Sequence, residues 1–399
     1  MASVPPITHA MASFTAAHTL CDRQVSSLPA GERCVVDESH EAASINCDEC
    51  RACLRDRVLS IADYEPRSTL VVPEHRLTRA RYPFVDVHSH QSAIRSDEAL
   101  NQLVSEMDLL NMRVMVNLSG SYGSTLRSRI QNLEGRYPSR FLTFANIDFS
   151  DVDSPDYSRR AADQLTEDVR NGARGLKIFK NLGMDLVDRQ RRRIHVDDPR
   201  FDPVFEVCSA AHIPVLIHSA EPKPFFDPVD RYNERWLELT MFPARARSPV
   251  HYPPWRTILD EQHRLFAKHP SVLFINAHLG WLGGDLEELG RLMDALPNMY
   301  TEIGAVLAEL GRQPRQARKW MIRYQDRVLF GKDHWNPEEY HTYFRVLETD
   351  DEYFDYFRKM HGSWKLYGLE LPDEVLRKLY YENALRVLPG IHSVLFTRT

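Results

Sequence analysis

The sequence predicts an α/β fold, a (β/α)8 TIM barrel with an irregular N-terminal arm, a long insertion after the fifth strand and a C-terminal helical cap. Two observations support this prediction. Short apolar segments ending in Gly, Ser, Asp or His recur eight times between residues 84 and 335, with helical patterns between them. Their starts are separated by 29, 28, 32, 40, 59, 27 and 28 residues, the length of a strand–helix unit with one large insertion.

The eight predicted strands are FVDVHSH (84–90), RVMVNLSGS (113–121), FLTFANIDF (141–149), ARGLKIFK (173–180), IPVLIHSA (213–220), VLFINAHLG (272–280), MYTEIGA (299–305) and RVLFGKDHW (327–335). An open doubly wound sheet is the alternative architecture. No GxGxxG motif follows an early strand, so the dinucleotide-binding version of that sheet has no support.

Helical patterns separate the strands, as in 96–112 and 284–296, where apolar residues recur at three-four spacing. The segment 371–390 begins at a Pro-Asp pair and ends at a Pro-Gly pair, which predicts a closing helix. The predicted divisions are an arm and extended lead-in (1–82), the barrel (83–390) with its insertion (220–270), and a C-terminal tail (391–399).

Composition narrows the function classes. Of 399 residues, 43% are hydrophobic and 27% are charged, which is typical of a globular chain with a sizeable core. A net charge of -6 does not indicate the basic surface of a nucleic-acid-binding protein. The apolar runs are too short to span a membrane. The first 20 residues lack the pattern of a secretory signal, so we expect a cytoplasmic protein that acts on a small molecule.

The cysteines are crowded at one end. Only Cys208 lies in the barrel, so the body is not built on disulfides. The other five are Cys21, Cys34, Cys47, Cys50 and Cys53. The last three could form half of a thiolate metal site, but no second CxxC pair follows to complete it. The arm instead has the composition of a poorly ordered leader.

Metal-binding residue types gather where four predicted strands end. These residues are His88 and His90 after the first strand, His218 after the fifth, His278 after the sixth and Asp333 after the eighth. The carboxyl ends of barrel strands meet on one face, where chemistry sits. Four imidazoles and one carboxylate at that face therefore predict a metal centre.

The alternation along the first strand places His88 and His90 on one face, with Val85 and Val87 on the other face, packed against the helices. Imidazole and carboxylate ligands suit Zn best, with Mn, Fe, Co or Ni feasible. Such a metal lowers the pKa of a bound water to about 7, and a neighbouring base then handles its proton. His278 and Asp333 are the candidates for that catalytic role.

These motifs resemble the amidohydrolase superfamily, in particular the amidohydrolase-related (family 2) branch that contains aminocarboxymuconate semialdehyde decarboxylase. The resemblance spans about residues 83–390 and rests on HSH, IHSAEP, AHLGW, LFGKDHW and LPDEVLRKLYYENALRVL, in that order. It implies one divalent metal held by His88, His90, His218 and Asp333. It also implies that His278 is the general base or electrostatic catalyst, and that the protein is a homodimer or higher homo-oligomer.

The sequence departs from the family pattern at three places. Lys332 stands where a small residue usually precedes the aspartate, which would change the pocket rim. The insertion 220–270 is long, and the first 60 residues have no familiar counterpart. Other branches of the superfamily bridge two metals with a carboxylated lysine on strand four, for which Lys177 and Lys180 are candidates.

Two reactions fit the predicted centre. A hydrolase would direct activated water at an ester, lactone or amide of a small organic substrate, whereas a non-oxidative decarboxylase would act on a small aromatic or unsaturated acid. A non-catalytic barrel that only binds ligands is the third hypothesis, although none of the ligands is missing. The insertion supplies Arg231 and Arg235 as candidates for holding a substrate carboxylate, and Trp281 and Trp335 are candidate pocket walls.

Overall fold

The computed structural model describes residues 59–61 and 63–396. Residues from Leu70 onward form one compact unit, and the chain before it is a separate unit. The predicted N-terminal leader and its five cysteines lie outside the described residues. Within the compact unit, the lead-in to the first strand is irregular, as predicted, and Ala80 N donates to Leu110 O.

The strands confirm the predicted α/β repeat, although each is shorter than its apolar segment. All paired neighbours are parallel, in the orders β1-β2-β3 and β4-β5-β6-β7-β8-β9. The strands are β1 (Phe84–Ser89), β2 (Met112–Asn117), β3 (Phe141–Thr143), β4 (Ala145–Asn146), β5 (Leu176–Ile178), β6 (Val215–Ile217), β7 (Phe274–Asn276), β8 (Met299–Glu302) and β9 (Val328–Leu329). Phe144 alone separates β3 from β4, so these two are one strand that hydrogen-bonds to β2 first and to the β5 side next.

Hydrogen bonds join the first strand to the last. Val87 N donates to Phe330 O at 2.9 Å, and Asp333 N donates to His88 O at 2.7 Å. The Asp86 carboxylate accepts from Lys332 N at 3.2 Å. The chain therefore returns to β1 after β9, as a barrel requires.

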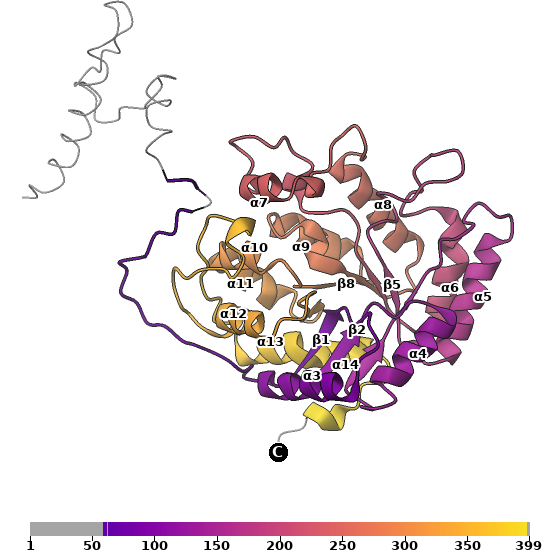
Figure 1. Cartoon of the computed structure of the whole chain (residues 1–399), viewed down its shortest axis with the longest axis horizontal. Helices are drawn as coiled ribbons and strands as arrows, with labels where there is room; N and C mark the ends of the chain where they lie inside the picture. The colour runs from indigo at the N-terminus through magenta and orange to yellow at the C-terminus, as the bar shows by residue number, and fades with distance from the viewer. Residues whose placement is uncertain (1–58, 62, 397–399) are drawn as a thin grey trace, which may run out of the picture. The chain divides into compact units, whose positions relative to one another are not determined.

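Helices alternate with the strands and surround them (Figure 1). They are α3 (Asp97–Leu110), α4 (Gly123–Leu133), α5 (Tyr157–Arg170), α6 (Asp202–Ala210), α8 (Trp255–Lys268), α9 (Leu286–Ala295), α11 (Pro314–Arg323) and α12 (Pro337–Glu348), with the short α10 (Leu307–Gly311) before α11. Ser96 caps α3 and Asp285 caps α9 with their side-chain oxygens, as their place before an apolar period predicts. None of the helices in the described residues has the length and apolarity to cross a membrane.

The alternation predicted for the first strand is wrong in one respect. Val85 and Val87 belong to an apolar cluster with residues of the other strands, including Leu216 and Leu329, and thus fill the barrel interior. Phe84 is the residue that packs on helix α12, through aromatic contacts. The pairing of β1 with β2 shifts register after Asp86, which breaks the strict period of two before His88 is reached.

The insertion after β6 is narrower than the predicted 220–270, because its last part is the barrel helix α8. It contains the short turns η2 (Lys223–Phe225) and η3 (Pro243–Arg245) and the helix α7 (Trp236–Met241). In Figure 1, α7 lies at the edge of the compact unit.

The predicted closing helix is present as α13 (Asp373–Arg377), a π-helical turn η6 (Lys378–Glu382) and α14 (Asn383–Val387). The widened π turn leaves Leu379 O able to accept from Phe330 N at 3.0 Å, which ties the C-terminal segment to β9.

Candidate metal centre

The site is built on a left-handed turn that follows β7. His278, Leu279, Gly280 and Trp281 have φ between 54° and 59°. Non-glycine residues pay about 1 to 2 kcal/mol each for this conformation, so the surrounding contacts must hold it. The turn stacks the Trp281 ring on the His278 ring at 4.6 Å between centroids.

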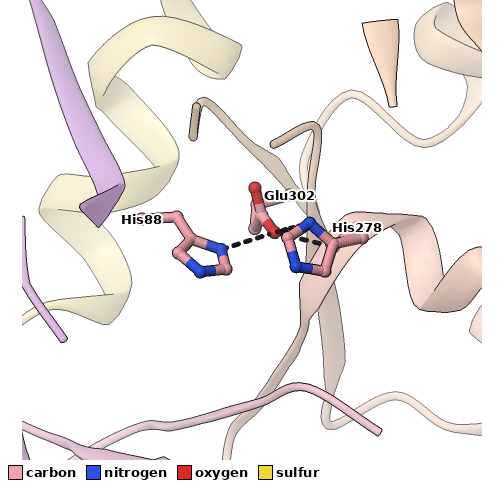
Figure 2. A group of neighbouring side chains, drawn as sticks. All are labelled: His88, His278 and Glu302. Atoms are coloured by element: carbon pink, nitrogen blue, oxygen red, sulfur yellow. Dashed lines mark hydrogen bonds and ion pairs between the residues drawn. The ribbon is translucent and has the colours of Figure 1, made fainter. Parts of the chain in front are cut away.

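His88 is fully buried and bonded on one side only. Its Nδ1 lies 3.0 Å from Glu302 Oε1, and because an ionised carboxylate only accepts, Nδ1 carries the proton (Figure 2). Nε2 then bears a lone pair, and it has no hydrogen-bond partner among the residues that the structure describes. Asp333 Oδ1 lies 3.5 Å from this Nε2. A lone pair facing a carboxylate oxygen is unfavourable unless a cation lies between them.

His90 completes the same group. Its Nε2 lies 3.3 Å from Asp333 Oδ1, while its Nδ1 contacts the Ser119 hydroxyl at 2.8 Å. Ligand atoms of His88, His90 and Asp333 all lie within 4.8 Å of one another. The residues present thus fit a divalent metal, which would be bound by imidazole nitrogens and one carboxylate.

His218 stands beside this group and is linked to it through His278. His278 Nδ1 lies 2.7 Å from Gly304 O, a pure acceptor, so this nitrogen donates and Nε2 carries the lone pair. His218 Nδ1, 3.3 Å away, donates to that lone pair. The remaining His218 Nε2 is a buried lone pair without a hydrogen-bond partner in the described chain, as a metal ligand would be. A four-ligand set would need His218 to move closer to His88 and His90.

Electrostatics favour neutral imidazoles and ionised carboxylates. Burial lowers the pKa of His88 to about 3, and burial also lowers the pKa values of His90 and His218. Burial acts to raise the pKa of Asp333, but the hydrogen bond with His90 and the neighbouring imidazoles hold it well below its usual range. Metal ligands must be deprotonated, so these shifts prepare the site for a cation.

Glu302, at the end of β8, is the site residue that the sequence analysis missed. Besides His88, its carboxylate accepts from His278 N at 2.7 Å and from Gly304 N at 2.5 Å. A Cβ atom on Gly304 or Gly331 would lie 2.7 or 2.4 Å from Glu302 Oε2, so both positions require glycine. A carboxylate at the end of a barrel strand, two residues before a glycine, was the available signal.

The two unusual lysines differ in role. Lys332 points toward α12, where its Nζ pairs with Glu339, so it does not alter the pocket rim as expected. Lys177 lies inside the barrel, 1% exposed, and its Nζ has no hydrogen-bond partner among the described residues. Lys180 is paired with Glu221. A metal-bridging role for Lys177 stays an untested alternative.

A cavity of about 680 Å³ lies between the insertion and the ends of β7 and β8. Of the predicted substrate residues, Trp281 and Arg235 line it. Arg235 is buried and paired with Glu238 at 3.4 Å. Arg231 is exposed and stacks on Tyr232 instead. Trp335 packs on Tyr340 of α12, 5.6 Å between ring centroids.

Comparison with known proteins identifies relatives by family and by fold. A family model described as an amidohydrolase matches residues 114–390, a range that contains His218, His278 and Asp333 but begins after His88 and His90. A search of curated proteins finds no match.

Three similar solved structures have low sequence identity. A 2,6-dihydroxybenzoate decarboxylase complexed with 2,6-dihydroxybenzoate is 14% identical over 77% of this chain and 99% of its own, with a TM-score of 0.50. An uncharacterised TIM-barrel protein from Bordetella bronchiseptica is 16% identical, covering 76% and 97%, with a TM-score of 0.48. A dihydroxybenzoic acid decarboxylase from Polaromonas sp. JS666, solved with manganese and an inhibitor, is 14% identical, covering 77% and 96%, with a TM-score of 0.48. The likeness supports the barrel fold alone.

Glu302→Gln should weaken metal binding by about 10- to 100-fold, the usual effect of losing an outer partner of a ligand. The amide keeps the size of the side chain but offers a donor where His88 and His278 N both require an acceptor. Titration of metal-loaded protein with a chelator measures this affinity. Glu309→Gln, in the wall of the cavity, is the matched control. Equal chelator midpoints for wild type and Glu302→Gln would contradict the assignment.

The stability of the metal-free protein should fall as the pH drops from about 7 to 5. Histidines of the unfolded chain take up protons near pH 6.5, whereas burial lowers the pKa values of His88, His90 and His218, so the unfolded state binds more protons. Tm measured against pH tests this, and the loss should be smaller in His218→Gln. The depressed pKa of Asp333 matters only at lower pH, near its unfolded value of about 4. A Tm that does not change between pH 7 and 5 would rule out neutral buried imidazoles.

Proposed function

The chain belongs to the amidohydrolase family, and from this premise we propose that it is a divalent-metal-dependent hydrolase. Its substrate would be a small organic ester, lactone, amide or carboxylate. The observation that supports the proposal most is the approach of the His88 Nε2 lone pair to Asp333 Oδ1 at 3.5 Å, an arrangement that calls for a cation.

His88, His90, His218 and Asp333 would hold one metal. Zn suits these imidazole and carboxylate ligands best, and Mn, Fe, Co and Ni are the other candidates. When bound, the metal would supply Lewis acidity and lower the pKa of a water molecule. Within the chain, Glu302 orients His88, and His278 orients His218. Each contact leaves a ligand nitrogen without a proton.

His278 is proposed as the general base; its Nε2, which accepts from His218 Nδ1 in this structure, would release that contact to accept a proton from the attacking water. Gly304 O fixes the tautomer that leaves this nitrogen basic. Trp281 stacks on the His278 ring and lines the cavity, so a substrate would enter against it. Asp333 would contribute its charge to the same centre.

A carboxy-lyase that acts on a small aromatic or unsaturated acid is the second candidate. The buried cation Lys177 favours it, because a cation inside the barrel suits an acid substrate. The two reactions are distinguished by their products. A hydrolase consumes water and releases no gas, whereas a lyase releases CO2 from an aromatic or unsaturated acid.

Elemental analysis of protein purified without added metal should find about one divalent ion per chain, because three imidazoles and one carboxylate fill a mononuclear site. Chelation should abolish turnover on a panel of lactones, esters and amides, and added Zn or Mn should restore it. CO2 detection on the aromatic acids of the same panel tests the lyase. Two metal equivalents that are lost together in Lys177→Met would replace this proposal with the bridged centre.

His218→Ala should lose metal and activity together, whereas His278→Ala should retain most of its metal and lose turnover by about 100-fold or more. The reason is that His278 presents its lone pair to His218 and is not needed as a ligand. Metal content and kcat of each purified variant are the measurements, with His341→Ala on α12 as a control away from the site. A folded but metal-free His278→Ala protein would make His278 a ligand instead of a base.

A further inference from the structure

Lys177 is a cation placed inside the barrel without a compensating anion in contact. Its neighbours on β5, Leu176 and Ile178, belong to the main core that includes the helices, so Lys177 faces the opposite way. It pairs in register with Leu216, which belongs to the apolar cluster of the barrel interior. Burial lowers the pKa of Lys177 to about 7, although the charges of Asp333 and Glu302 oppose this shift.

A buried ammonium group without a hydrogen bond destabilises the fold, because no protein contact replaces its lost hydration. The other two lysines near the strand ends avoid this cost. Lys180 pairs with Glu221, and Lys332 pairs with Glu339. Lys177 Nζ has no hydrogen-bond partner in the part of the chain that the structure describes. A buried lysine of this kind is typical of a site where a bound ligand supplies the missing hydrogen-bond acceptor.

Only the Phe179 side chain separates Lys177 from His90 of the metal site. Its Nζ lies 5.3 Å from the centre of the Phe179 ring, and that ring lies 5.8 Å from the ring of His90. The charge of Lys177 contributes to lowering the pKa values of His88 and His218. The His90 side chain is 25% exposed, so solvent reaches the histidine cluster itself.

The cavity at the barrel mouth, in contrast, offers cations that are already compensated. Four cationic side chains line it, and each has a carboxylate partner. The pairs are Lys223 with Asp227, Arg235 with Glu238, Arg256 with Glu288, and Arg312 with Glu234. Lys177, in contrast, has no carboxylate in contact with its Nζ among the described residues, so it is the cation that is left to bind an anionic substrate.

We propose that Lys177 Nζ binds a carboxylate group of the substrate, which makes a small organic acid the substrate class. The inference rests on the proposed function for the place of the metal and deepens it by naming the group that the barrel interior recognises. Nζ would donate charge-assisted hydrogen bonds to the carboxylate oxygens, while the reacting bond lies at the histidine layer.

Calorimetric titration of the metal-loaded protein with benzoate and with benzamide, its neutral counterpart, tests the proposal without any turnover. Wild type should bind benzoate more tightly than benzamide. Lys177→Met should weaken benzoate binding by at least about tenfold and leave benzamide binding and metal content unchanged. Lys268→Met, which removes a surface cation paired with Asp202, is the matched control and should bind both probes as wild type does. Equal affinity of wild type for the two probes, or unchanged benzoate binding in Lys177→Met, would overturn the inference.

A second measurement separates ligand binding from a structural role. In metal-free protein, Lys177→Met should raise Tm, because Met fills the space without an unpaired charge. A lowered Tm would show that Lys177 supports the fold and would overturn the proposal. Uptake of carbon-13-labelled bicarbonate as a lysine carbamate, seen by NMR in wild type and absent in Lys177→Met, would also overturn it. Loss of the metal or of hydrolysis would count against the proposed function alone, since probe binding is read separately.

Discussion

The Glu302 carboxylate is the constraint on which the centre depends. It is fully buried, and it accepts hydrogen bonds from β1 through His88, from the turn after β7 through His278 N, and from its own strand end through Gly304 N. Burial acts to raise the pKa of Glu302, but the neighbouring imidazoles of His88 and His278 and the hydrogen bonds that these residues donate lower it to about 2. One ionised group thus holds together the ends of β1, β7 and β8 and sets the tautomer of His88.

The rest of the centre follows from proton positions that the backbone sets. Gly304 O can only accept, so it determines which nitrogen of His278 is protonated, and His278 in turn determines the proton of His218. The left-handed turn at His278, which has unfavourable φ angles, places the imidazole for these hydrogen bonds. Similar positive φ angles occur at Ala220, Ala305 and Asp333, so strain gathers where the strands β6, β8 and β9 end.

Much of the fold could be predicted from the sequence because strand segments and helical periods alternate at a regular spacing. The histidines and Asp333 could also be placed at the strand ends. The face of Val85 could not, since a register shift in β1 cancels the alternation. The role of Glu302 depends on contacts with residues far away in sequence, such as His88, and the pairing of Arg235 with Glu238 follows from a helix inside an insertion with weak periodicity.

The seam between β1 and β9 has a consequence for biosynthesis. His88 and Asp333 are separated by 245 residues, yet they must meet across that seam, and β9 is itself bonded to Leu379 near the C-terminus. At roughly 5 to 20 residues per second, a ribosome needs roughly 10 to 50 seconds to deliver the second residue after the first. Throughout that interval β1 has an open edge, so we expect the emerging chain to need a chaperone until β9 is made.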